Sequence, residues 1–346
     1  MGLPDLAEID SLEVAVIITD ELDPISPSPN PSVQHASHFM GIPVSAVENP
    51  GARGGAASEM KMSSICCGSH GLSLMITAKK DERTHTLLFD AGPEDEAWER
   101  NANRMRAEID KIEHIVLSHY HRDHSGGLLR AIEMINERKD TDSKKVVVDL
   151  HPSRPEYRGI ATPYGPISLE ADPTFPEVER AGAQLLLSKE PHTILDNMFL
   201  VSGEIPRQTS YETGLPGGIR FTRHGEAKKD GLWEKDEQLM EERYVMCKIK
   251  DKGLVIFTGC GHAGVINTAL DAQRLSGKNA VYYISGGYHM SDASPEKLQK
   301  TIQDMKDIRP RLLHGGHCTG WKFKTEMEKA MPGVVVPCTV GLTYRF

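Results

Sequence analysis

Three histidines and one aspartate lie in a single short segment of this chain: His119, His121, Asp123 and His124. His119 and His121 stand two residues apart in an extended segment, so both side chains can point toward one ion. Asp123 and His124 follow where the chain turns and can face a second position nearby. Imidazole and carboxylate ligands suit zinc, iron or manganese, and a site that keeps open positions is catalytic rather than structural. A surface loop rich in histidine by chance is the alternative, and so dense a cluster disfavours it.

The elements on either side of this segment predict how it is held in place. Residues 115–117 form an apolar run that predicts a short buried strand. Residues 128–135 carry apolar side chains at helical spacing, and Ser125 is the expected N-cap. The segment is therefore predicted to form a turn between a strand and a helix, where its ligands can be held rigidly.

Further strands and helices are predicted along the chain. Residues 14–18, 73–77, 86–89 and 146–150 are expected strands, and residues 94–106 form an expected helix. The second half of the chain alternates strands with helices. Strands flanked by helices on both faces make a layered α/β sandwich.

Two stretches lack such patterns. Residues 24–57 are rich in Pro, Ser, Gly and Ala and predict a long loop; both a lid over the site and a disordered insertion fit this composition. Residues 219–236 carry mixed charges and are expected to be irregular and to flank the site. We therefore expect two insertions, at about residues 21–60 and 207–236.

Length and composition limit the class of protein. Because motifs from Asp90 to His317 must converge on one site, we expect a single domain over residues 1–346. The net charge of −9 argues against a surface that binds nucleic acid. No segment approaches the ~18 consecutive apolar residues of a membrane span, and the acidic N-terminus lacks the pattern of a signal peptide. Six cysteines in a chain of this length do not make a disulfide framework, which favours a cytoplasmic location.

The pattern His-x-His-x-Asp-His over residues 119–124 resembles the H-x-H-x-D-H signature of the metallo-β-lactamase fold superfamily. Three further segments resemble that superfamily in the expected order: residues 86–92, 253–262 and 311–320. The first of them ends a predicted strand with Asp90, which by this resemblance supports the metal loop. The resemblance spans residues 12–346 and implies an αββα sandwich, in which two mixed β-sheets are flanked by helices.

A more specific pattern resembles one branch of the superfamily, named after an archaeal dihydropterin ribofuranosyl-aminobenzene 5'-phosphate synthase. Five short motifs carry it, at residues 70–73, 202–207, 259–264, 286–289 and 317–320. The name of the branch says little about what an individual member does.

The resemblance also implies metal ligands at the ends of the later strands. His262 and His317 each follow an apolar run and precede a helical pattern, and each could instead donate a hydrogen bond to a ligand. Superfamily members often place an aspartate that bridges two ions where this chain has Cys260, and some use a cysteine there. Whether Cys260, His262 or both bind metal stays open. His192 and His224 are weaker candidates.

Other polar side chains are candidates for holding a substrate. Glu204 and Arg207 stand together just after an apolar run. Arg207 could bind a phosphate or carboxylate through two parallel hydrogen bonds, or form a structural ion pair with Glu204 or Glu212. His151 ends a predicted strand at the expected active-site edge, and His289 follows two glycines and a tyrosine. Either histidine can line the pocket or be buried and satisfied by backbone groups.

Together these residues predict a metal-dependent hydrolase that uses a zinc-activated water on a small anionic ester, such as a phosphodiester, lactone or thioester. Zinc lowers the pKa of its bound water, and Asp123 would orient the hydroxide and accept its proton. Two zinc ions are expected, with iron or manganese as alternatives. Two other functions stay open: a synthase that condenses phosphoribosyl pyrophosphate with an aminobenzoate, and a non-catalytic metal-binding protein. The sequence leaves the oligomeric state open, and a homo-oligomer is compatible with it.

Overall fold

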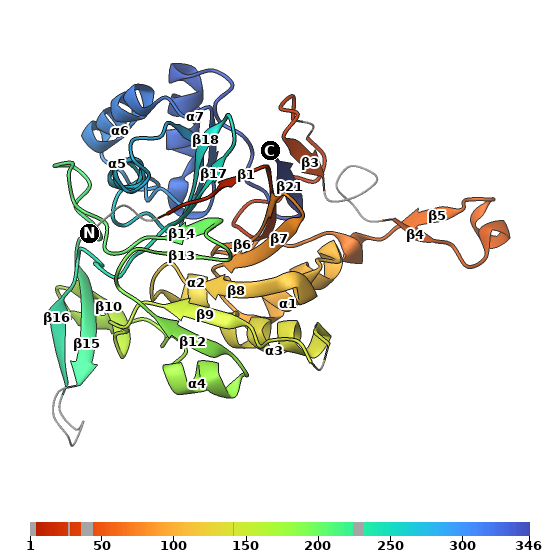
Figure 1. Ribbon diagram of the computed structural model, residues 1–346, viewed down its shortest axis with the longest axis horizontal. Coiled ribbons are helices and arrows are strands. Elements are labelled where there is room, and N and C mark those ends of the chain that lie inside the picture. The colour runs from red at the N-terminus through yellow and green to blue at the C-terminus, as the bar shows by residue number, and fades with distance from the viewer. Residues whose placement is uncertain (1–4, 27, 36–43, 141, 224–230) are drawn as a thin grey trace.

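The computed structural model describes residues 5–26, 28–35, 44–140, 142–223 and 231–346 of the chain. Two β-sheets of eight and seven strands pack against each other, and helices cover the outer face of each (Figure 1). The helices on the eight-stranded sheet are α1 (Asp95–Met105), α3 (Leu128–Arg138) and α4 (Phe175–Arg180). Those on the seven-stranded sheet are α5 (Val265–Leu275), α6 (Pro295–Ile308) and α7 (Trp321–Ala330). This arrangement confirms the predicted αββα sandwich.

The eight-stranded sheet contains the strands predicted from the first half of the chain. Its order is β12 (Gln184–Leu187), β9 (Val147–Leu150), β8 (Ile112–Val116), β7 (Arg83–Phe89), β6 (Ser73–Lys80), β2 (Ser11–Ile18), β21 (Leu342–Arg345) and β3 (Val33–His35). Strands β7, β8, β9 and β12 pair in parallel, so their carboxyl ends meet at one edge of the sheet. The predicted metal-binding segment, residues 119–124, begins shortly after β8, at that edge.

The seven-stranded sheet supplies the second half of the same edge. Its order is β13 (His192–Ile194), β14 (Phe199–Val201), β17 (Val245–Ile249), β18 (Gly253–Thr258), β19 (Val281–Gly286) and β20 (Leu312–Gly315), and β1 (Glu8–Ile9) pairs with β17. Strands β18, β19 and β20 are parallel. Cys260 follows the carboxyl end of β18, and His317 follows that of β20.

An apolar core fills the space between the two sheets. Leu74 and Ile76 alternate along β6 and point into it, and they meet Val201 and Phe257 from the facing sheet. This alternation is the period of a strand with one face buried. Each large apolar side chain that is fully buried contributes roughly 1.5–3 kcal/mol, so the core holds the two sheets, and with them the two halves of the edge, together.

The turn after β8 differs from the prediction in one detail. Residues 122–125 form a short helix, α2 (Arg122–Ser125), and the N-cap of α3 is Gly127. The prediction of Ser125 as an N-cap is therefore wrong. Its hydroxyl instead donates to Asp172 Oδ1 at 2.5 Å, which ties the metal-binding segment to the loop before α4.

The prediction of an irregular stretch at residues 219–236 is wrong for residues 219–223 and 231–235, and residues 224–230 lie outside the described residues. The structure places there the strands β15 (Gly218–Arg223) and β16 (Gly231–Lys235), which join β10 (Tyr157–Thr162) and β11 (Gly165–Ser168) in a four-stranded antiparallel sheet. Phe221 and Trp233 face each other across the hairpin, with ring centroids 5.4 Å apart. Cross-strand aromatic pairs stabilise a sheet. The charged residues that alternate with these rings hid the strand pattern.

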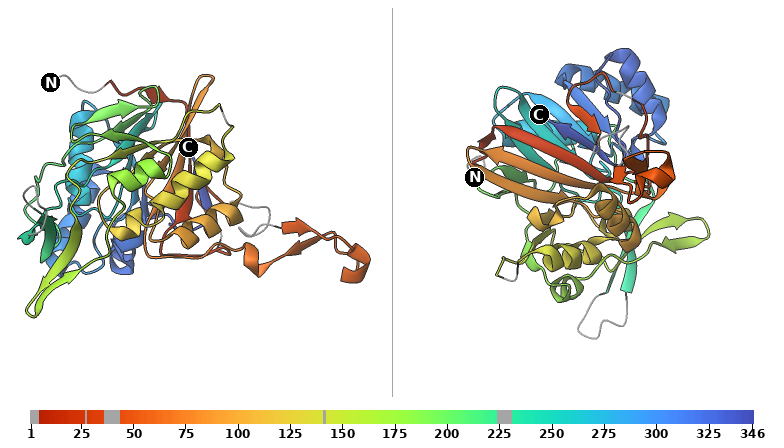
Figure 2. Two further views of the ribbon diagram at one scale, coloured as in Figure 1. Left: turned by 90° about the horizontal axis from the view of Figure 1, so that it is seen from below. Right: turned by 90° about the vertical axis from the view of Figure 1, so that its right-hand side faces the viewer.

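Part of the long loop predicted at residues 24–57 forms regular structure. Strands β4 (Val44–Ala46) and β5 (Ser58–Met60) form a hairpin, which extends far from the sandwich (Figures 1 and 2). Residues 36–43 of this insertion lie outside the described residues. Among the residues that the structure describes, no helix combines the length and apolarity that a membrane span requires.

Candidate metal centre

The predicted metal ligands converge at the edge where the carboxyl ends of β8, β18 and β20 meet. One group of four contains His119, His121, Cys260 and His262, all of them buried. Their ligand atoms all lie within 4.8 Å of one another. His121 Nδ1 is 3.1 Å from His119 Nε2 and 3.2 Å from His262 Nε2. These residues form the first ligand group.

A second group lies beside the first and shares one residue with it. It contains Asp123, His124, Cys260 and His317. Cys260 Sγ is 3.1 Å from the Nε2 atoms of both His124 and His317. Asp123 Oδ2 is 3.1 Å from His317 Nε2 and 3.5 Å from His124 Nε2. The structure thus brings all seven predicted ligands into two adjoining groups, with Cys260 common to both.

The separations between these donor atoms fit metal ions. Zinc binds imidazole nitrogen at about 2.0–2.1 Å, so two ligands of a tetrahedral ion stand about 3.3 Å apart. The nearest donor pairs in the two groups lie 3.1 to 3.5 Å apart, close to this value, and all donors of a group lie within 4.8 Å of one another. Imidazole, thiolate and carboxylate are also the donor types that zinc, iron and manganese accept. The residues therefore fit the predicted metal ions in number, chemistry and spacing.

Asp90 orients the ligands from behind, as the resemblance implied. Its carboxylate accepts hydrogen bonds from the backbone N–H and hydroxyl of Ser118 and lies 2.6 Å from His124 Nδ1. Ser118 Oγ in turn lies 2.9 Å from His119 Nδ1. These contacts occupy the Nδ1 atoms of His119 and His124 and leave Nε2 of each for a metal. Asp90 has a φ of +60°, a left-handed backbone that directs its side chain under the metal-binding segment.

Asp20, which the sequence did not single out, plays the same part for His317. Its Oδ1 is 3.2 Å from His317 Nδ1, and its Oδ2 is 2.9 Å from His70 Nδ1. His70 Nε2 lies 3.8 Å from Asp123 Oδ2, and the His70 side chain is 69% exposed at the mouth of the centre. Asp20, His70 and His317 are close enough to form a third group, but His317 Nε2 already faces Cys260.

Glu242 positions the loop that carries Cys260 and His262. Its fully buried carboxylate accepts backbone hydrogen bonds from Gly261, His262 and Ala263, at 2.8, 2.9 and 2.5 Å. Burial raises the pKa of Glu242, against these hydrogen bonds, which lower it. In the sequence Glu242 stands in a run of charged residues, which is typical of a solvent-exposed surface. No local signal therefore indicated that it supports the metal centre.

A buried ion pair fixes the ends of β8 and β9 beside the centre. The Arg243 side chain is fully buried and donates to Asp149 Oδ1 at 2.8 Å and to the carbonyl oxygens of Asp149 and Leu117. The Arg243 backbone N–H donates to the carbonyl of Ser118, the residue before the first ligand. Sequence reasoning missed Arg243 because its partners are remote along the chain.

Charge differs between the two ligand groups. In the first group, burial lowers the pKa of His121 to about 3. Burial, together with the neighbouring His124 and His121, also lowers the pKa of His119, so both rings are neutral. In the second group, burial alone would lower the pKa of His124, but Asp123 and Asp90 outweigh it and raise that pKa. An ion bound by His124 must therefore compete with a proton.

The histidines predicted to contact substrate lie at different distances from this centre. The His289 ring is 4.5 Å from that of His262, and its Nδ1 is buried without a hydrogen-bond partner among the described residues. His151 Nδ1 accepts a hydrogen bond from the backbone of Ser153, and its carbonyl accepts one from the Tyr120 hydroxyl. His289 thus borders the ligand groups, whereas His151 supports the turn from behind.

Glu204 and Arg207 are not part of either ligand group. Glu204 is exposed, and the Arg207 guanidinium donates to the carbonyl oxygens of Ile205 and Gln238. Glu212 accepts instead from backbone groups at the start of α5. Of the weaker metal candidates, His192 lies 2.7 Å from Asp149 and outside both groups, and His224 lies outside the described residues.

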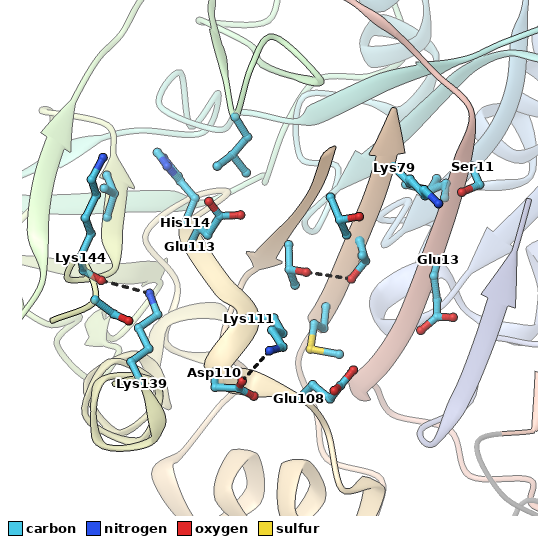
Figure 3. A pocket seen from close by; sticks show the side chains of 18 of the residues that line it. Ser11, Glu13, Lys79, Glu108, Asp110, Lys111, Glu113, His114, Lys139 and Lys144 are labelled. Carbon is cyan, nitrogen blue, oxygen red and sulfur yellow. Dashed lines mark hydrogen bonds and ion pairs between the residues drawn. The ribbon is translucent and has the colours of Figure 1, made fainter. Parts of the chain in front are cut away.

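A cavity of about 1030 Å³ lies away from the metal ligands (Figure 3). Lys111 and Val147, at the amino ends of β8 and β9, line it, together with Lys79, Glu113 and Lys144. It therefore lies toward the edge of the sheet opposite to the ligands, and none of them lines it.

Comparisons with known proteins agree with this geometry. A family model described as "Metallo-beta-lactamase superfamily" matches residues 70–185. A Methanocaldococcus jannaschii protein named 7,8-dihydropterin-6-methyl-4-(beta-D-ribofuranosyl)-aminobenzene-5'-phosphate synthase is 27% identical over 278 residues, which cover 77% of this chain and 89% of that protein. An uncharacterized protein of the same organism is 30% identical over 260 residues, covering 75% of this chain and 88% of that protein. The solved structure of Tm1679, described as a metal-dependent hydrolase of the beta-lactamase superfamily, superimposes with a TM-score of 0.64 at 18% identity, covering 96% of this chain and 98% of the other.

Proposed function

Because the chain belongs to the metallo-beta-lactamase superfamily, we propose that it is a metal-dependent hydrolase of a small anionic ester. The observation that carries this proposal is the pair of complete ligand groups that share Cys260. A binding protein that had lost catalysis would have no need to keep both groups complete. The partly exposed Asp123 and the exposed His70 leave one side of the second group open to a substrate.

Five imidazoles, one thiolate and one carboxylate make a ligand set suited to two zinc ions, with iron or manganese as alternatives. When bound, such ions lower the pKa of a coordinated water and polarise a carbonyl or phosphoryl oxygen. The first group, His119, His121 and His262, would hold one ion, and the second group the other.

The chain's own residues would orient the reactants and handle the proton. Burial raises the pKa of Asp123, but His124 and His317 outweigh it and hold that pKa below its usual range, so the carboxylate is ionised. The carboxylate can accept a proton from the attacking water. His70 and His289 border the two groups on different sides and are proposed to contact the substrate. Hydrolysis adds water across the ester bond and releases an acid together with an alcohol or thiol.

The proposed substrate is a small molecule such as a phosphodiester, lactone or thioester. An anionic group would be drawn to two adjoining cations. The net charge of −9 over the whole chain disfavours a nucleic acid. The six cysteines are all free in the structure, which fits a reducing compartment such as the cytoplasm.

A synthase is the second candidate, because the M. jannaschii relative that covers 77% of this chain carries a synthase's name. That name describes a product that contains a dihydropterin. The product of condensing phosphoribosyl pyrophosphate with an aminobenzoate would contain no pterin. The assay for this candidate therefore offers a dihydropterin donor as well as phosphoribosyl pyrophosphate with p-aminobenzoate. It follows product formation and, for the second pair, the release of pyrophosphate and carbon dioxide.

The zinc-loaded protein should hydrolyse at least one of three probes: bis(p-nitrophenyl) phosphate, an acyl lactone and an acyl thioester. Asp123→Ala should abolish that turnover, while Asp110→Ala, which changes an aspartate near the remote cavity, should leave it unchanged. Turnover that survives Asp123→Ala or removal of the metal would refute the proposal. The proposal would also be refuted if the protein cleaved none of the three probes and formed product in the synthase assay.

A further inference from the structure

We propose that the cavity shown in Figure 3 is a second binding site, for a small molecule that joins an anionic head group, a carboxylate or a phosphate, to an apolar body. The site lies apart from the metal centre, because no member of the two ligand groups lines it. The inference therefore does not rest on the proposed hydrolase activity. The volume of about 1030 Å³ is at the upper end of the range of about 300–1,000 Å³ that is usual for pockets that bury small ligands.

The floor of the cavity is a part of the eight-stranded sheet that its helices leave uncovered. On β7, Leu88 packs in the apolar cluster beneath α1 and α3, while Thr84 and Thr86, on the same face of the strand, line the cavity. On β6, Met75 and Thr77 share a face and both line the cavity. The hydroxyls of Thr77 and Thr86 hydrogen-bond to each other at 3.0 Å. These floor side chains are therefore uncharged, and hydroxyls replace the apolar groups found under the helices.

Apolar side chains border this floor. Four that line the cavity are buried or half-buried: Leu12, Val147, Leu195 and Phe346. An apolar ligand group that displaces water from such side chains is bound favourably, in proportion to the area covered. The cavity can thus hold the body of a ligand as well as a charged group.

Most of the carboxylates that line the cavity already have a basic partner. Three of the four are paired: Asp110 with Lys111 at 3.2 Å, Glu13 with Arg345 at 2.5 Å, and Glu113 with His85 at 2.8 Å. Glu108 is the fourth. These pairs leave little negative charge to repel an anion.

Four lysines that line the cavity have no carboxylate partner among the described residues: Lys79, Lys139, Lys144 and Lys145. Their positive charges exceed the single negative charge of Glu108. The cavity is therefore cationic, although the whole chain carries a net charge of −9. A hollow lined by one sign of charge raises the local concentration of ligands of the opposite sign.

Lys139 and Lys144 form the best place for the head group. The Lys139 ammonium donates to the Lys144 carbonyl oxygen at 3.4 Å, which holds the two residues together (Figure 3). Burial lowers the pKa of Lys139, so its charge is incompletely solvated and would be stabilised by an anion. The head group is therefore assigned to this pair, with the apolar body over the threonine floor.

The His114 imidazole is a further polar group on the wall of the cavity. The residue is only 6% exposed, and its Nε2 is buried without a hydrogen-bond partner in the described parts of the chain, 3.6 Å from Asp149 Oδ2. Buried polar groups in folded proteins are nearly always hydrogen-bonded. A ligand oxygen would offer this ring a partner that the surrounding chain does not.

The inference is tested with four eight-carbon probes that differ in the head group: octanoate, octyl phosphate, octanol and octyltrimethylammonium. The full-length protein, as purified, is titrated with each probe by calorimetry at equal ionic strength. The two anions should bind with dissociation constants of about 0.1–1 mM, and the neutral and cationic probes at least about tenfold more weakly. The anion that binds more tightly identifies the preferred head group. The inference is overturned if neither anion binds or if octanol binds as tightly as the better anion.

Lysine variants test the assigned head-group position. Lys139→Gln and Lys144→Gln should each weaken binding of the better anion by about three- to tenfold. Lys306→Gln is the matched control, because it removes an exposed lysine from α6, outside the cavity, and should leave the affinity unchanged. Equal affinities in all three variants would contradict the assignment. Should either cavity variant fail to fold by circular dichroism, the comparison of the four probes still decides.

The carbon-13 methyl resonance of Met75 locates the bound probe. This resonance, identified by its loss in Met75→Leu, should shift when octyl phosphate or octanoate binds, because Met75 lines the cavity. The same shift is expected in Asp123→Ala, since Asp123 is remote from the cavity and serves only the proposed hydrolase. Binding that leaves the Met75 resonance unmoved, or that is lost in Asp123→Ala, would place the probe elsewhere and overturn the inference. A protein that shows these shifts but hydrolyses none of the ester probes would keep this site and count against the hydrolase alone.

Discussion

Glu242 offers the sharpest test of how the fold builds the metal centre. The carboxylate accepts two N–H groups, from Gly261 and His262, on Oε1, and the N–H of Ala263 on Oε2. Glu242→Gln keeps the shape of the side chain but replaces one of these oxygens by an NH₂ group. With the amide oxygen at the Oε1 position, the bonds from Gly261 and His262 become neutral and the bond from Ala263 is lost.

The magnitude follows from these three bonds. A hydrogen bond to a charged group contributes about 1.5–3 kcal/mol and a neutral one about 0.5–1.5 kcal/mol. Losing one charged bond and weakening two to neutral ones therefore costs about 3.5–6 kcal/mol. Burial raises the pKa of Glu242, which means that the charge itself is costly to bury, and removing it offsets part of the loss. We expect the free energy of unfolding of the metal-free protein to fall by about 2–3 kcal/mol.

The same substitution should lower the affinity for the ion that His262 is proposed to hold. Loss of a group that supports a metal ligand commonly lowers affinity by about 10–100-fold. Urea unfolding of the metal-free protein gives the first quantity, and competition with a chromogenic zinc chelator gives the second. Glu237→Gln is the control, because Glu237 also accepts a backbone hydrogen bond but lies just after β16, away from the ligand groups, and pairs with Lys235. If Glu242→Gln lost stability but bound zinc as tightly as this control, its proposed role in positioning the ligands would be wrong.

Three further predictions follow from buried charges and from the metal itself. Arg243→Met should lower the free energy of unfolding by about 3–5 kcal/mol because it removes the fully buried guanidinium from Asp149 and leaves the His192 imidazole as its nearest basic partner. The exposed Arg83→Met should cost under about 1 kcal/mol by the same urea assay; equal losses would contradict the buried pair. Burial raises the pKa of Asp172 to about 6 in the folded protein, so the unfolded chain loses this proton at lower pH than the folded chain does. The group therefore makes folding less favourable as pH rises from about 4 to about 6. Asp172→Asn, which keeps an acceptor for Ser125, should therefore gain up to about 3 kcal/mol over wild type between pH 4 and pH 7, and a pH-independent difference would refute this. Removing the metal with a chelator should lower the melting temperature measured by calorimetry, since free metal at a thousandfold excess over its Kd stabilises the folded chain by about 4 kcal/mol; an unchanged melting temperature would argue against bound ions.

The parts of the centre that could be predicted are those with a local signal. His119 to His124 carry their chemistry in their spacing, and the strand before them and the helix after them follow from apolar periodicity. Cys260, His262 and His317 could be proposed because each follows a strand-like run in a recognisable motif. The fold itself follows from the same alternation of strands and helices.

The supporting residues could not be predicted, because their partners are remote in sequence. Asp20 contacts His317 across 297 residues, and Arg243 contacts Asp149 across 94. Neither residue differs locally from an ordinary surface charge, and Glu242 stands between two other charged residues. The hairpin at β15–β16 was missed for a related reason: its aromatic pair is visible only once Phe221 and Trp233 are placed opposite each other.

The division of ligands between the two sheets links metal binding to folding. One sheet supplies the segment from His119 to His124, and the other supplies Cys260, His262 and His317, so each of the two proposed ions would be held by residues from both. Ions bound there would act as crosslinks across the junction that the apolar core also closes. A mutation in that core has to weaken metal affinity if it lets the sheets shift, even when it lies far from every ligand. Because Cys260 belongs to both groups, displacement of its loop would disturb both ions at once, and the two sites are expected to be lost together rather than one at a time.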